Sequence, residues 1–240
     1  MAPGDAQTGY RVFVTKKTAR PLPRLHDIEA VVFDLDGVLV DSEPIHFRAA
    51  NRVLARYGAA ISAAEYRGFI GLGEAATWEA WREHSHIPAV VTTLIAAHTQ
   101  ARLDEIAAGV DAIDDAVQLA RRLRESGMRL AIASSSTKAI IDALLRALAV
   151  DDIFAVRISG EDPDVQESKP APDVYLTAAA RLGVEVAACL AIEDSGPGVC
   201  AAKRAGMTCI AVPNRWTADQ DFSEADVVLE SLRYFPLLVL

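Results

Sequence analysis

The segment VVFDLDGVLVDSE, residues 31–43, ends an apolar run on two aspartates, Asp34 and Asp36, that one residue separates. Side chains at positions i and i+2 of a strand point to the same face. Two like charges would therefore crowd one place unless the backbone turns between them or a cation lies there. Gly37 follows directly and allows a tight turn that would separate the two side chains. We expect the chemistry of the protein at this strand end.

From Ile28 onward, short apolar segments alternate with helical patterns. The strand-like segments are 28–35, 128–134, 189–194, 208–212 and 226–230. The helical patterns are 111–127, 138–150, 172–183 and 197–206. Three of these helices end on a glycine, the residue that most readily adopts the positive φ of a C-terminal cap. The alternation predicts right-handed crossovers and an α/β fold with a doubly wound parallel sheet.

The stretch from about residue 43 to 109 departs from this alternation. It has no strand-like run and predicts several helices, at 46–58, 63–68, 74–85 and 88–109. An all-helical insert directly after the first strand would lie above the carboxyl ends of the strands, where open α/β sheets bind ligands. The predicted units are an N-terminal extension (1–27), an α/β catalytic core (28–42 and 110–240) and an all-helical cap domain (43–109).

The composition is that of a folded protein with an acidic surface. Of the 240 residues 51% are hydrophobic, and 33 Asp and Glu exceed 24 Lys and Arg, for a net charge of −9. Such a surface repels nucleic acid and anionic membranes, so neither is an expected partner. No apolar run approaches the ~20 residues that span a bilayer, and the start has no long apolar segment, so we do not expect a secretory signal there. Cys189, Cys200 and Cys209 are expected to be buried, reduced thiols of a cytoplasmic monomer.

Polar side chains gather at the predicted strand ends and in the loops that follow. They are Asp34 with Asp36, Ser134, Lys169, and Glu193 with Asp194. Carboxylates that converge from different strands need a cation, and all-oxygen ligation suits Mg²⁺. Both Asp34 and Asp36 could be metal ligands. Alternatively, one carboxylate, held ionised by Mg²⁺ and Lys169, attacks, while its neighbour is kept protonated and delivers a proton.

A serine-rich stretch, SSSTKA, begins at a strand-to-helix junction with Ser134. The Ser134 hydroxyl and the amides that follow it, beginning at Ser135, face the positive end of the next helix, a favourable place for phosphate. Ser134, Ser136 or Thr137 could also be the N-cap of that helix. Mg²⁺, Lys169 and the helix N-terminus would together form a pocket that binds a phosphoryl group.

The chain resembles the haloacid dehalogenase superfamily of phosphatases and phosphomutases, and within it the β-phosphoglucomutase-like and sugar-phosphatase branch with a helical cap. The matching stretches are FDLDGVLVDSEPIHF (33–47), IASSS (132–136), ESKPAPDVY (167–175) and IEDSGPGVCAAKRAGM (192–207). Four motifs in the family's order are a strong signal, whereas a lone DLDG would be weak. Members that cleave carbon–halogen bonds lack the second aspartate, so the resemblance favours phosphoryl transfer on a HAD-like Rossmannoid core.

The resemblance also implies roles for the site residues. Asp34 would be the nucleophile that forms an aspartyl-phosphate. Asp36 would be the general acid and then the general base, with its backbone carbonyl bound to Mg²⁺. Ser134 and Lys169 would hold the transferring phosphoryl group, and Asp194 would complete the metal site.

Three assignments in and near the predicted pocket have alternatives. Either Glu193 or Asp194 could be the direct metal ligand, with the other as its partner. His46 matches a histidine common near the substrate in this branch, although a single histidine on a helix is more often structural. Trp78 and Trp81, three residues apart, are interpreted as cap core and not as a platform for a sugar.

The predicted function is a Mg²⁺-dependent phosphatase of a small phosphorylated metabolite, such as a sugar phosphate. The alternative is a sugar phosphomutase, which would exclude water and return the phosphoryl group to the sugar. A mutase must grip a distal phosphate with cap cations, and β-phosphoglucomutases carry a lysine and an arginine near the cap loop. This chain has Ile70 and Glu74 at about those places, although Arg67 is nearby and could substitute.

Two further interpretations concern the cap loop and the pocket. GLGEAA (71–76) fits a dinucleotide-binding GxGxxA pattern, but no strand precedes it and its glutamate would repel a pyrophosphate. We interpret it as a cap loop that contacts the leaving group. A third function, from a different class, is a catalytically silent protein that binds a phosphometabolite in a retained pocket.

Overall fold

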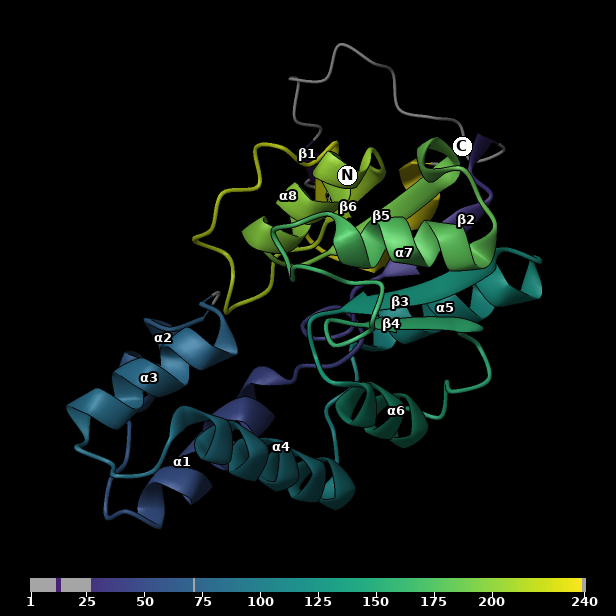
Figure 1. Cartoon of the computed structure of the whole chain (residues 1–240). Helices are drawn as coiled ribbons and strands as arrows, with labels where there is room; N and C mark the ends of the chain where they lie inside the picture. Colours follow the sequence, from purple (N-terminus) through teal and green to yellow (C-terminus); the bar gives the residue numbers. More distant parts are fainter. Residues whose placement is uncertain (1–11, 14–26, 71, 239–240) are drawn as a thin grey trace, which may run out of the picture.

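The computed structural model describes residues 12–13, 27–70 and 72–238. In this part of the chain a seven-stranded sheet has the order β1-β7-β6-β5-β2-β3-β4 (Figure 1). The strands are β1 (Val12–Phe13), β2 (Ala30–Phe33), β3 (Arg129–Ser134), β4 (Val156–Ser159), β5 (Cys189–Glu193), β6 (Thr208–Ala211) and β7 (Val227–Leu229). Only the β1–β7 pair is antiparallel, so β7, β6, β5, β2, β3 and β4 form the predicted parallel sheet.

The helices fall into two groups along the chain. They are α1 (Glu43–Ala55), α2 (Ala63–Arg67), α3 (Glu74–His84), α4 (Val91–Ala108), α5 (Asp114–Glu125), α6 (Lys138–Ala147), α7 (Asp173–Leu182) and α8 (Gly196–Ala205), with short 3₁₀ segments at Val186–Ala188 and Leu232–Leu238. Helices α1 to α4 follow β2 without an intervening strand, which confirms the predicted helical insertion. None of the helices in the described ranges is long and apolar enough to cross a bilayer.

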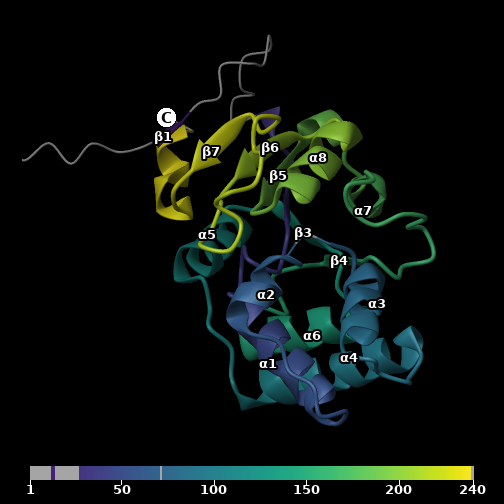
Figure 2. The same cartoon turned by 90° about the vertical axis from the view of Figure 1, so that its left-hand side faces the viewer.

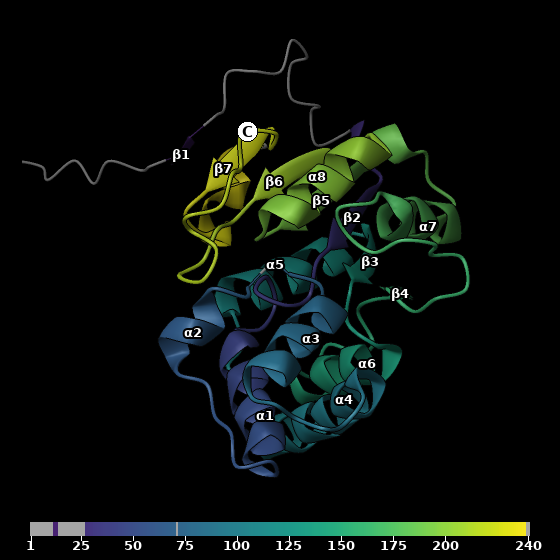
Figure 3. The same cartoon turned by 60° about the vertical axis from the view of Figure 1, so that its left-hand side comes forward.

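Alternate residues of β2 build two separate cores, one on each face of the sheet. Val31 and Phe33 pack with α5, α6 and the C-terminal 3₁₀ segment, whereas Ala30 and Val32 pack with α7 and α8. All four are fully buried, as expected for a central parallel strand covered on both sides. Helices therefore cover both faces, which is the doubly wound arrangement predicted from the sequence (Figure 3).

The helices α1 to α4 have a third core of their own. Trp78 and Trp81 lie in this core, as predicted, and are 1% and 4% exposed. Their ring centroids are 5.1 Å apart in an edge-to-face contact. Phe69 and Tyr66 add further ring contacts to Trp81. The four helices lie next to the end of the sheet where β2 and β3 terminate, and α4 lies beside α6 (Figure 2).

Two strands were not predicted. β4 is a short edge strand whose first two residues, Val156 and Arg157, are only half-buried, so its apolar signal is weak. β1 lies inside the predicted extension 1–27, most of which is outside the described residues. Among the cysteines, Cys189 and Cys209 are buried free thiols, but Cys200 is only half-buried, contrary to the prediction.

A substitution in the first core tests the packing. Phe154 is 2% exposed and contacts Phe33 edge-to-face at 5.7 Å. We expect Phe154→Ala to lower the free energy of unfolding by about 3–5 kcal/mol, because it removes buried area and leaves a cavity. Tyr57→Ala, at a 39% exposed ring, is the control and should change it by less than about 0.5 kcal/mol. Equal effects in urea denaturation would contradict this assignment of the core.

Candidate active site

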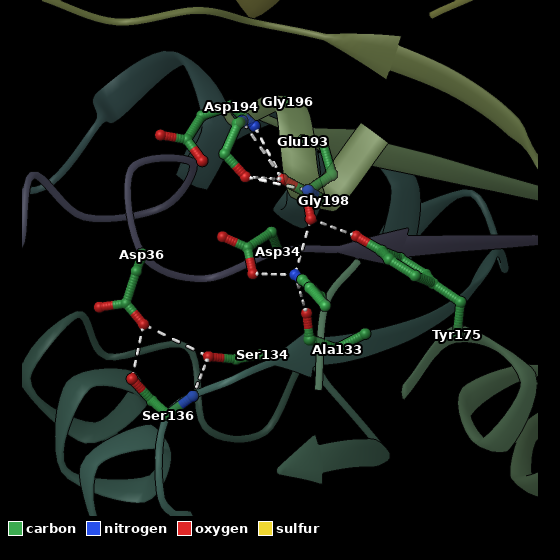
Figure 4. Close-up of polar contacts among 12 residues, drawn as sticks. Asp34, Asp36, Ala133, Ser134, Ser136, Tyr175, Glu193, Asp194, Gly196 and Gly198 are labelled. Carbon is green, nitrogen blue, oxygen red and sulfur yellow. Dashed lines mark hydrogen bonds and ion pairs between the residues drawn. The ribbon is translucent and has the colours of Figure 1, made fainter. Parts of the chain in front are cut away.

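Strand register brings the sequence-predicted residues together at one edge of the sheet. Phe33 of β2 pairs with Ile132 of β3 and with Ile192 of β5, so the residues after these three lie side by side. The Asp34 amide continues the ladder by donating to the Ile192 carbonyl at 2.9 Å. Figure 4 shows the resulting convergence of side chains at the strand ends.

Lys169 reaches this edge from the loop before α7 and binds three acceptors. Its Nζ donates to Asp34 Oδ1 at 2.6 Å, to Glu193 Oε1 at 2.6 Å and to the Ala133 carbonyl at 2.9 Å. An ammonium group has three donor hydrogens, so this set uses all of them. Lys169 is therefore held in one place beside Asp34.

Glu193 is completely buried and both of its oxygens are occupied by protein donors. Oε1 accepts from Lys169 and from the Tyr175 hydroxyl, each at 2.6 Å. Oε2 accepts from the amides of Asp194 and Ser195 and from the Ser195 hydroxyl. This saturation favours Glu193 as the residue that orients Lys169, and leaves Asp194 better placed as a direct metal ligand.

Asp194 lies against the turn that follows Asp34. Its Oδ2 accepts from Asn214 Nδ2 at 2.7 Å, and the same nitrogen is 3.3 Å from the Gly37 carbonyl. Gly37 has a φ of +79°, and a Cβ built there would lie 2.1 Å from Asp194 Oδ2. Only glycine therefore allows this turn to pass so close to the carboxylate.

The charges of the buried cluster are unbalanced. Asp34, Glu193 and Asp194 each offer an oxygen within 4.8 Å of the others, and Lys169 bonds to the first two of these carboxylates. Burial, partly offset by Lys169, raises the pKa of Asp34 to about 8. Burial together with the neighbouring carboxylates raises the pKa of Asp194 well above its usual range. Three carboxylates face one ammonium group, and their oxygens are suitable ligands for a hard metal ion. The cluster therefore fits a divalent cation.

Asp36 has different surroundings. Its Oδ2 accepts from the hydroxyls of Ser136 at 2.8 Å and Ser134 at 3.3 Å. Its Oδ1 is 3.7 Å from His46 Nε2 and 3.8 Å from Arg102 Nη2, which come from α1 and α4. Although burial acts in the opposite direction, His46 and Arg102 hold the pKa of Asp36 well below its usual range.

The low pKa of Asp36 in this arrangement runs against the alternative in which this aspartate is kept protonated. The prediction considered the negative charge of Asp34 and partial burial, both of which would raise the pKa of Asp36. It did not include the two side chains from the helical insertion, because nothing in the sequence shows that Arg102 reaches the strand end. Asp36 is ionised here, and it needs additional negative charge nearby to take up a proton.

The serine stretch is divided between two tasks. Thr137 is the N-cap of α6, with Oγ1 accepting from the Ile140 amide, so the capping role falls to one of the three candidates. Ser134 is instead bonded to Asp36 and accepts from the Ser136 amide at 3.0 Å. Ser135 is exposed where the stretch borders the cavity.

A cavity of about 410 Å³ lies between the sheet edge and the helical insertion. Seven of the eight predicted site residues line it: Asp34, Asp36, His46, Ser134, Ser135, Lys169 and Asp194. Glu193 lies behind Lys169 and does not. The prediction missed Arg102, Tyr175 and Asn214. Asn214 follows the end of β6, so the rule that located the other polar residues could have found it, whereas Arg102 and Tyr175 carry no such signal.

A small-to-large change next to Glu193 tests how tightly this cluster is packed. Alanine usually stabilises a helix relative to glycine, but a Cβ on Gly198 in α8 would lie 2.0 Å from the Glu193 carboxylate. We therefore expect Gly198→Ala to lower the free energy of unfolding by about 1–3 kcal/mol. Gly73→Ala, where a Cβ meets nothing within 4 Å, is the matched control. A stabilised Gly198→Ala variant in thermal denaturation would contradict the geometry.

Comparison with known proteins places this geometry in a family. The model of haloacid dehalogenase-like hydrolases matches residues 31–212. Protein CbbY of Rhodobacter capsulatus is 37% identical over 210 residues, which cover 83% of this chain and 92% of that protein. Hexitol phosphatase B of Escherichia coli K12 is 35% identical over 211 residues, or 85% and 93% of the two chains.

A solved structure agrees with these sequence relatives. A mutant of CbbY from Rhodobacter sphaeroides, in complex with xylulose 1,5-bisphosphate, matches with a TM-score of 0.79 and 31% identity over 85% of this chain and 95% of that one. The family match and the relatives each extend over most of the chain, including the strand ends that carry the acidic cluster. The protein accordingly belongs to the haloacid dehalogenase-like hydrolases, in the branch of CbbY, hexitol phosphatase and β-phosphoglucomutase, and is a phosphatase of that family.

Proposed function

We propose that the protein is a Mg²⁺-dependent phosphatase that hydrolyses a small sugar phosphate through an aspartyl-phosphate on Asp34. The observation that carries this proposal is the buried cluster in which Lys169 joins Asp34 to Glu193 beside Asp194. A carboxylate nucleophile, a fixed cation and a surplus of negative charge are the elements that phosphoryl transfer requires. The relatives named as a hexitol phosphatase and as binding a sugar bisphosphate support a sugar phosphate as substrate.

The metal would be held by the carboxylates of Asp34 and Asp194 and by the backbone carbonyl of Asp36. When bound, Mg²⁺ supplies positive charge that keeps Asp34 ionised and neutralises phosphoryl oxygens. Glu193 contributes indirectly, because its two oxygens are engaged by Lys169, Tyr175 and backbone donors. Its part is to hold Lys169 against Asp34.

The reaction has two steps at the same carboxylate. Asp34 attacks phosphorus, a new oxygen–phosphorus bond forms, and the bond to the leaving sugar oxygen breaks. Once Asp34 is bonded to phosphorus, the Lys169 hydrogen that Asp34 accepted can turn to the phosphoryl oxygens, which the hydroxyl of Ser134 and Ser135 also bind. Asp36 gives a proton to the leaving oxygen and then takes one from the water that attacks the aspartyl-phosphate, which releases phosphate.

The low pKa of Asp36 is compatible with this role if the substrate changes its surroundings. A phosphate dianion between Asp34 and Asp36 places negative charge beside Asp36, which raises its proton affinity. Substrate groups that bind His46 or Arg102 would also remove charges that now stabilise the ionised form. Proton transfer would then depend on an occupied pocket.

Metal removal gives the first functional prediction. We expect phosphate release from p-nitrophenyl phosphate to fall to background after treatment with EDTA and to return when Mg²⁺ is added in excess. The reason is that the buried carboxylates cannot all remain ionised beside a dianionic substrate without a cation. Activity that survives exhaustive chelation, verified by metal analysis, would refute the metal requirement.

Amide variants separate the two aspartates. Asp34→Asn should form no covalent phosphoenzyme, whereas Asp36→Asn should lose about 10²–10⁴-fold in kcat and still bind Mg²⁺ and beryllium fluoride. Rapid-quench trapping measures the phosphoenzyme for Asp34→Asn. The kcat and the binding of beryllium fluoride are measured for Asp36→Asn. An Asp36→Asn variant as active as the parent protein would overturn its role as proton donor.

The substrate assay also distinguishes the other functions. With β-glucose 1-phosphate, a phosphatase releases inorganic phosphate, whereas a mutase forms glucose 6-phosphate faster than it releases phosphate. No turnover of any ester in a broad panel, with Mg²⁺ present, would favour a silent binding protein.

A further inference from the structure

The part of the cavity formed by α3 has a different character from the strand edge. Glu74, Thr77, Trp78 and Trp81, at positions i, i+3, i+4 and i+7, form one face of this helix, and all four line the cavity. Because the reacting phosphate is assigned to the strand edge, this face is available to the remainder of the substrate. Its charges and hydrogen-bonding groups should therefore decide which substrates fit.

Four basic side chains line the described part of the cavity, and each of them bonds to or faces an acidic group. Among the described lining residues they are Lys169, Arg102, His46 and His98. Lys169 is bonded to Asp34 and Glu193. Arg102 lies 3.8 Å from Asp36 and donates to Ser136 Oγ at 3.1 Å, and His46 also faces Asp36. These three lie where the transferring phosphate is expected.

The remaining basic residue of the lining, His98, and the nearby Arg67 do not form a second phosphate site. His98 Nδ1 is 2.9 Å from Glu74 Oε1, and burial lowers the pKa of His98, which favours its neutral form. Arg67, which could have replaced the cap cations of a mutase, is exposed, lies over the Trp216 ring at 5.3 Å and is not among the lining residues. No described cation therefore lies on the α3 face itself, and Arg102 and His46, whose charge reaches Glu74, face Asp36.

The same face offers groups that suit hydroxyls. The Glu74 side chain is 38% exposed, and within the described chain no hydrogen bond reaches its Oε2. Its pKa is lowered despite partial burial, because His98 bonds to it and Arg102 and His46 add positive charge, so Glu74 is ionised. The Thr77 side chain, which carries a hydroxyl, lines the same part of the cavity, whereas Trp81 Nε1 is buried in the core of the helical insertion.

We propose that Glu74 selects for substrates with one phosphate, by accepting hydrogen bonds from the hydroxyls of a sugar or polyol and by repelling a second phosphate at the far end. A hydroxyl donates to a carboxylate in a charge-assisted bond, whereas a phosphate dianion beside a carboxylate is a like-charge pair without a cation between them. The proposal rests on the proposed phosphatase function.

The test compares two substrates that differ by one phosphate group. Values of kcat/KM are measured with Mg²⁺ for fructose 6-phosphate and fructose 1,6-bisphosphate, with p-nitrophenyl phosphate as a probe that carries no distal group. We expect the wild-type protein to favour the monophosphate at least about tenfold. Glu74→Gln should shift the ratio toward the bisphosphate by about tenfold, and Glu74→Arg should shift it further, because it places a cation at that position.

Glu83→Gln is the matched control, since Glu83 lies on the same helix with its side chain 70% exposed and is absent from the cavity lining. It should leave the ratio unchanged. A wild-type protein that hydrolyses p-nitrophenyl phosphate but turns over the bisphosphate as well as the monophosphate would overturn the role of Glu74 alone. So would Glu74 variants with an unchanged ratio. A wild-type protein that hydrolyses none of the three esters would overturn the proposed phosphatase function, and the role of Glu74 with it.

Discussion

The arrangement of the site depends on the ammonium group of Lys169, which binds Asp34, Glu193 and the Ala133 carbonyl at once. These acceptors come from the ends of three neighbouring strands, so one side chain ties β2, β3 and β5 together at their functional edge. The ammonium group also only partly compensates the buried carboxylates. That residual negative charge is the physical reason for a cation at this place, because buried charges need partners.

A second connection joins the helical insertion to the core at Asp36. Ser134 and Ser136 bind one of its oxygens from the sheet side, while His46 and Arg102 approach the other from α1 and α4. Any movement of α1 and α4 relative to the sheet would change the charges around Asp36. In the proposed reaction, the position of the insertion and the protonation of Asp36 are therefore coupled.

Close packing of glycines against carboxylates explains why the acidic residues keep their orientations. Gly37 leaves room for Asp194, and Gly198 leaves room for Glu193, since a Cβ at either position would come within about 2.1 Å of a carboxylate oxygen. Asn214 donates to Asp194 and Tyr175 donates to Glu193. Steric packing as well as electrostatic attraction therefore fixes the orientation of the two carboxylates.

The sequence by itself determined the alternation of β2, β3, β5, β6 and β7 with helices, the helical insertion and the strand ends at which Asp34, Ser134 and Glu193 lie, but not β1 or β4. These features follow from local periodicity and from the rule that parallel strands share one functional edge. Tertiary structure alone decided which side chains from distant elements meet there. Arg102 on α4, which packs beside α6, lies 3.8 Å from Asp36, and together with His46 it lowers the pKa of Asp36. Local patterns contain no information on such contacts, since long-range packing sets the electrostatic environment of a buried group.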